Sequence, residues 1–137
     1  MWRQQPTPDA FRTRNAALLE LSKEHANHSA LIEIVEETSK PPSDETRRVA
    51  MEVFKTLGSS LSGIAMTLEG NQVRSALNRA ILTSMMFFVK QLQPTKIFKH
   101  PADAARWIRP YVQVSESGFE NNLVAALEEL RSSIKAA

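Results

Sequence analysis

In this chain of 137 residues, the side chains best placed for chemistry are two hydroxyls in one loop, those of Ser39 and Ser43. Ser43 follows two prolines and precedes Asp44 and Glu45, which is the pattern of a helix N-cap. A phosphate on such a hydroxyl would meet free backbone N–H groups and the positive end of the helix dipole. Ser43 and Ser39 are therefore candidate phosphorylation sites, and a plain N-cap is the alternative interpretation of Ser43.

The other reactive side chains form no catalytic or metal-binding pattern. His25 and His28 lie three positions apart, but the sequence offers no second cluster of ligands to converge with them. It also lacks a nucleophile elbow, a phosphate-binding glycine loop and a recognisable pair of catalytic carboxylates. We therefore expect no catalytic residue, no metal and no cofactor, and a protein that is not an enzyme. The absence of cysteine suits a reducing cytoplasm, where we expect the protein to reside.

A basic stretch interleaved with aromatic residues could bind RNA or an acidic partner. Its basic residues are Lys90, Lys96, Lys99, Arg106 and Arg109, and its aromatic residues are Phe98, Trp107 and Tyr111. The formal net charge of only +2 favours a solvated basic rim instead, and it gives no case for DNA binding.

Hydrophobic periodicity and turn residues predict strands that alternate with helices. Helices are expected over residues 8–25, 43–57, 71–92 and 101–111 and from 117 onward, with strands over 30–36, 62–68 and 95–99. Such alternation indicates an α/β fold with a small, mainly parallel sheet of three or four strands packed against helices. Trp2 is interpreted as the remnant of an edge strand.

The predicted helix over 71–92 has apolar residues on two faces. One face is expected to lie on the sheet and includes Val73, Leu77, Ala80, Ile81, Ser84 and Phe88. The second carries Leu82, Met86 and Val89 beside Arg79 and Lys90, and we interpret these five residues as a partner-binding surface. Because three large apolar side chains are rarely left in water, either the last helix covers this surface or another protein does.

The last predicted helix carries one apolar stripe, with a capping-box pattern at Ser117 and Glu120. The stripe consists of Phe119, Leu123, Leu127, Leu130 and Ile134. It can fold back on its own domain or pack on a second protein.

The segment KIFKHPADAARWI resembles the end of STAS-like (SpoIIAA-like) domains. The matching positions are Ile97, Phe98, Ala104, Ala105, Trp107 and Ile108. The resemblance implies a STAS-like α/β domain over residues 1–113 with its first strand short or absent, and an added C-terminal amphipathic helix over 114–137. It also implies a bacterial signalling module.

Taken together, these features predict a non-enzymatic module that binds a signalling protein or forms a homodimer. The alternative is a small apolar, lipid-like ligand held between sheet and helices near Met66, Met85, Phe87 and Phe88. Weak RNA binding through the basic rim is the third hypothesis. No membrane insertion is expected, because the longest nearly apolar run is about half of the ~20 residues that a bilayer requires.

Overall fold

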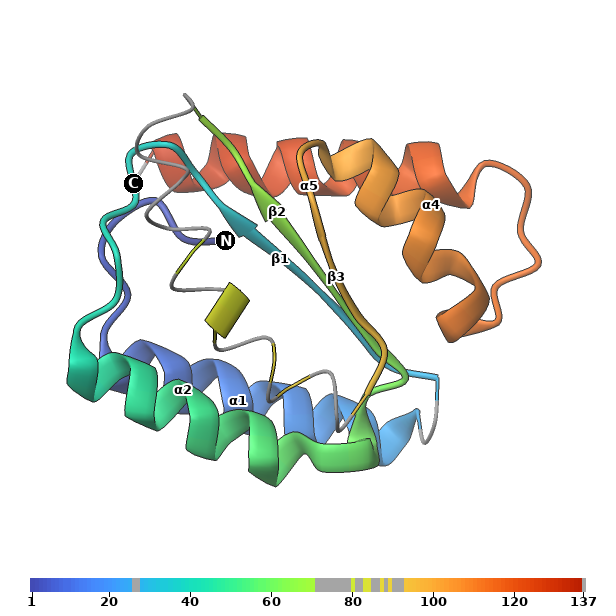
Figure 1. Cartoon of the computed structure of the whole chain (residues 1–137). Helices are drawn as coiled ribbons and strands as arrows, with labels where there is room; N and C mark the ends of the chain where they lie inside the picture. Colours follow the sequence, from blue (N-terminus) through green and yellow to red (C-terminus); the bar gives the residue numbers. More distant parts are fainter. Residues whose placement is uncertain are drawn as a thin grey trace.

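A computed structural model of the chain describes residues 1–25, 28–70, 80, 83, 84, 87, 89 and 93–136. Its elements are α1 (Pro8–Glu24), β1 (Ala30–Val35), α2 (Asp44–Leu57), the 3-10 turn η1 (Gly58–Ser60), β2 (Gly63–Leu68), β3 (Thr95–Phe98), α4 (Pro101–Val112) and α5 (Phe119–Ala136) (Figure 1). The alternation of strands and helices in the described residues confirms the predicted α/β class.

The three strands form one parallel sheet in the order β1-β2-β3. Trp2 extends this sheet beyond β1 through an isolated parallel bridge to Val35. Its backbone N–H donates to the carbonyl of Ile34 (2.7 Å), and its carbonyl accepts from the N–H of Glu36 (2.9 Å). The predicted remnant of an edge strand is therefore present as a single paired residue.

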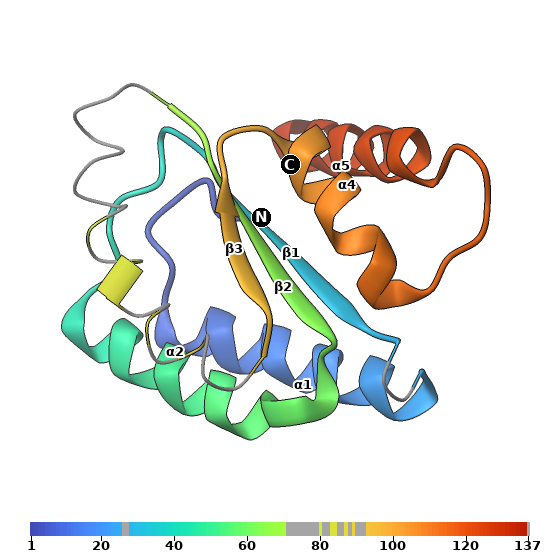
Figure 2. The same ribbon diagram turned by 45° about the vertical axis from the view of Figure 1, so that its right-hand side comes forward.

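Helices cover both faces of the sheet: α1 and α2 lie on one side, and α4 and α5 lie on the other (Figures 1 and 2). The larger core lies under α1 and α2 and includes Phe11, Phe54 and Ile64. The smaller core, around Ala65 and Ile108, lies under α4. Successive β2 residues belong to different cores because side chains alternate across a strand.

Three predicted helix boundaries are confirmed by the cap geometry. The side chain of Thr7 accepts a hydrogen bond from the N–H of Ala10 at the start of α1. Ser43 caps α2 in the same way, and Gly58 ends α2 with a φ of 43°, a conformation that favours glycine. The predicted capping box of α5 is wrong, because the helix starts at Phe119.

Among the described residues, no helix combines the length and the apolar content needed to cross a bilayer.

Candidate functional site

The predicted partner surface on residues 79–90 is only partly within the described residues. Four of its members lie outside them: Arg79, Leu82, Met86 and Lys90. The fifth, Val89, is fully buried in the larger core, so in this conformation the chain itself covers it. Ala80 and Ser84, which were expected on the sheet, are exposed. The side chain of Phe87 is 66% exposed.

The two candidate phosphorylation sites differ in access. The hydroxyl of Ser39 is buried and donates to the carbonyl of Gln4 (2.9 Å). Ser43 is exposed, and its hydroxyl accepts from the N–H of Thr46 (3.2 Å). A kinase could therefore reach Ser43 in this conformation, whereas Ser39 is covered by the N-terminal segment.

The basic rim is partly neutralised within the chain. Arg106 pairs with Asp103 (3.2 Å), and Arg109 pairs with Glu120 (2.9 Å). Lys96 and Lys99 are exposed.

The aromatic residues of this stretch contact one another. The ring of Trp107 lies 5.7 Å from that of Phe98 and 4.7 Å from that of Tyr111. Phe98 and Trp107 also pack against the smaller core. These rings therefore contribute to packing and offer little free surface on which bases could stack.

Within the described part of the chain, no three His, Cys, Asp or Glu side chains are grouped so that they could hold a metal ion. His25 instead forms the C-cap of α1, where its backbone N–H donates to the carbonyl of Leu21.

The apolar stripe of α5 is covered only along its first half. Phe119 and Leu123 pack against the smaller core, and Leu127 is half-buried. Farther along, Leu130 is 46% exposed and Ile134 is 39% exposed. We refer to Leu127, Leu130 and Ile134 as the α5 patch.

An ion-pair network ties the second half of α5 to the carboxyl ends of β1 and β2. Arg131 donates to Glu69 (2.6 Å) and lies 3.5 Å from Glu36. Glu36 in turn accepts two hydrogen bonds from Arg3, at 2.6 and 2.9 Å, and these raise the pKa of the Arg3 guanidinium. The network fixes the position of α5, while Leu130 and Ile134 of the α5 patch remain exposed to solvent.

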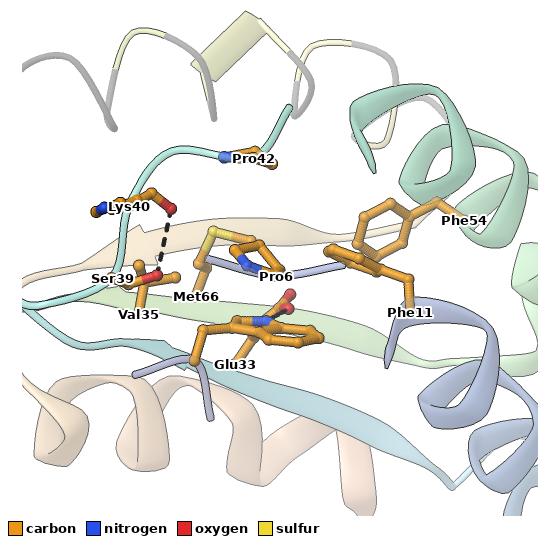
Figure 3. A pocket seen from close by; sticks show the side chains of 10 residues that line it. Pro6, Phe11, Glu33, Val35, Ser39, Lys40, Pro42, Phe54 and Met66 are labelled. Carbon is orange, nitrogen blue, oxygen red and sulfur yellow. Dashed lines mark hydrogen bonds between the residues drawn. The ribbon is translucent and has the colours of Figure 1, made fainter. Parts of the chain in front are cut away.

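A small cavity lies between the sheet, the N-terminal segment and the loop before α2 (Figure 3). We call it the Trp2 cavity; its volume is about 40 Å³, and it is lined by Trp2, Pro6, Phe11, Glu33, Val35, Ser39, Lys40, Pro42, Phe54 and Met66. Met66, one of the described residues predicted to line an apolar pocket, borders it. Phe87 is exposed, and Met85 and Phe88 lie outside the described residues.

Sequence reasoning missed the polar centre of this cavity. Glu33 lies on β1 and is only 3% exposed. One of its carboxylate oxygens, Oε1, accepts hydrogen bonds from the indole N–H of Trp2 and from Nη1 of Arg14. The Arg14 guanidinium also lies 4.4 Å from the centroid of the Phe11 ring. The one available signal was an acidic residue inside an otherwise apolar strand.

Comparison of the chain with protein-family models, with curated proteins and with solved structures finds no significant match. The resemblance to STAS-like domains therefore stays a hypothesis that depends on the residues quoted for it.

Proposed function

We propose that this chain is a non-enzymatic, STAS-like protein-interaction module that acts by pairing with a second copy of itself through α5. The observation that carries the proposal is the exposure of the α5 patch on a helix whose position is otherwise fixed. Leu130 and Ile134 remain 46% and 39% exposed although Phe119 and Leu123 on the same stripe are packed. Apolar side chains gathered on one helix face are typical of an interaction surface.

A second copy fits this surface because the stripe can pair with itself around a two-fold axis. The sequence of α5 also places acids before a base: Glu128 and Glu129 precede Lys135, whereas Arg131 is paired within its own chain. In an antiparallel pair, the acids of one helix lie beside the basic end of the other. Opposite charges would then flank the apolar seam and fix the register of the two helices.

Sedimentation equilibrium tests this proposal with a matched pair of variants. The unmodified chain should show a monomer–dimer equilibrium. Replacing Leu130→Asp together with Ile134→Lys should leave only monomer, because charges in the seam oppose its burial. Leu21→Lys serves as the control, since Leu21 is similarly exposed (47%) but lies on α1. A chain that is monomeric at every concentration, or a double variant that dimerises like the unmodified chain, would contradict self-pairing.

A further inference from the structure

We propose that the Trp2 cavity binds the hydroxyl end of a small aliphatic alcohol. The cavity walls are almost entirely apolar, with rings contributed by Trp2, Phe11 and Phe54 and a thioether by Met66 (Figure 3). A volume of about 40 Å³ exceeds the ~10–15 Å³ that one water requires. It is far below the ~300 Å³ of a pocket that encloses a drug-sized molecule. The cavity therefore has room for one end of a ligand.

Unpaired polar atoms lie at the Glu33–Arg14 pair, where Nε and Nη2 of Arg14 are buried without an acceptor, and Glu33 is the member of the pair that lines the cavity. Its Oε1 is already occupied by Trp2 and Arg14, but its Oε2 is buried and has no hydrogen-bond partner. A buried carboxylate oxygen without a donor is strongly unfavourable. The missing partner must supply a hydrogen, because an ionised carboxylate only accepts.

The charge balance restricts the donor to a neutral group. Arg14 pairs with Glu33 at 2.5 Å, and the N-terminal amine of Met1 also lies close enough to interact electrostatically with both, so the carboxylate already has its counter-charge. A ligand ammonium would add a further cation beside Arg14 and the N-terminal amine of Met1, and a carboxylate would face Glu33. A hydroxyl donates one hydrogen bond without adding charge. An aliphatic alcohol also matches the apolar walls, because its carbon chain needs no hydrogen-bond partner.

The remainder of the ligand can leave the cavity, which is partly open to solvent. Its sides are held in place by the N-terminal segment and the loop before α2. Ser39 donates to the carbonyl of Gln4 (2.9 Å), and Thr46 donates to the carbonyl of Pro6 (3.3 Å). These bonds keep the walls in position, so the site is preformed and binding requires little reorganisation.

Three probes of similar size and different charge test the proposal: 1-butanol, butylammonium and butyrate. Each is titrated into the full chain while the indole N–H resonances of Trp2 and Trp107 are followed by NMR. Trp2 borders the cavity, whereas Trp107 packs on the opposite face of the sheet and is the internal control. Butanol should shift the Trp2 resonance saturably, at least about tenfold more tightly than either charged probe, and should leave Trp107 unchanged.

Two variants keep the test decisive. Glu33→Gln weakens the accepting group and should reduce butanol affinity about tenfold. Met66→Phe leaves Glu33 intact and fills the cavity, so it should abolish the saturable shift of the Trp2 resonance. This variant replaces Glu33→Gln as the test if Glu33→Gln fails to fold. The proposal would be overturned if butanol gave no saturable shift at Trp2 or shifted Trp2 and Trp107 equally. It would also be overturned if all three probes bound with equal affinity, or if neither variant changed the affinity for butanol. The cavity would then hold water only.

Discussion

Glu33 holds a carboxylate among aromatic rings, on the face of β1 that packs against α1 and α2. Its partner Arg14 lies 19 residues earlier in the sequence, on α1. The guanidinium of Arg14 also lies within 5.7 Å of the centroids of Trp2, Phe11 and Phe54. The pair therefore links the N-terminal segment, α1, α2 and the sheet, so its loss should destabilise the folded chain.

Arg14→Met should lower the free energy of unfolding by about 3–5 kcal/mol, because it leaves a buried carboxylate without its counter-charge. Combining it with Glu33→Leu should recover part of that loss, since two apolar side chains need no partner, whereas the indole N–H of Trp2 loses its acceptor. Urea denaturation followed by circular dichroism measures both effects. A double variant as unstable as Arg14→Met alone would show that the pair is not the source of the loss.

Ser43 gives a second prediction at the residue scale. Ser43→Ala should reduce the free energy of unfolding by about 1 kcal/mol, because the N–H of Thr46 loses its acceptor. Ser43→Asp should unfold like the unmodified chain, because aspartate is an equally good N-cap and favours the helix dipole. Thermal unfolding of both variants is the measurement. No loss in Ser43→Ala, or the same loss in Ser43→Asp, would contradict a stabilising role for this capping hydrogen bond.

At the scale of elements, local signals predicted the ends of α1 and α2 well. Thr7, Ser43 and Gly58 act through bonds within one turn, so their roles are visible in the sequence. The burial of Val89 within its own chain could not be predicted, because periodicity gives the spacing of apolar residues but not which neighbour covers them. The start of α5 was also predicted wrongly, since Glu120 pairs with Arg109 of α4, a contact between two helices.

That contact between α4 and α5 should be sensitive to acid. A hydrogen bond from its own backbone N–H, followed by the Arg109 guanidinium, lowers the pKa of Glu120. A lowered carboxyl pKa stabilises the folded state above the unfolded value of about 4.3, and the effect is lost as the pH falls through the folded value. The protection factors of the amides in the first turns of α5, which compare each rate with the intrinsic exchange rate at the same pH, should therefore fall below about pH 4.

Glu120→Gln is the matched variant for this prediction. It should remove the acid-induced change in exchange while leaving the amides of α1 unaffected. The proposed role of Glu120 would be contradicted if the α5 amides of the unmodified chain had the same protection above and below about pH 4.

The ion-pair network at the end of α5 gives a further prediction. Arg131→Met should remove the hydrogen bond to Glu69 and the ion pair with Glu36, and it should increase hydrogen exchange in the last turns of α5. Arg12→Met is the control, because Arg12 forms an exposed pair with Asp9 within α1. Exchange that is unchanged in Arg131→Met would mean that apolar packing alone holds the helix.

At the scale of the whole molecule, the two faces of the sheet differ in how completely they are covered. The face under α1 and α2 encloses the larger core and the Trp2 cavity, while α5 extends past its packed residues and leaves an apolar patch. The alternation of strands and helices was enough to predict the α/β class. The exposure of Leu130 could not be predicted, because it depends on where the covered surface beneath α5 ends.

Disulfide cross-linking of a single introduced cysteine tests self-pairing through α5 most directly, because the chain contains no cysteine of its own. In an antiparallel pair, Leu130 lies near the two-fold axis, where two cysteines can approach within the ~4.4–6.8 Å between Cα atoms that a disulfide spans. Leu130→Cys should therefore form covalent dimers under mild oxidation, whereas the equally exposed Leu21→Cys should remain monomeric. Monomeric Leu130→Cys, or equal cross-linking of both variants, would contradict the account.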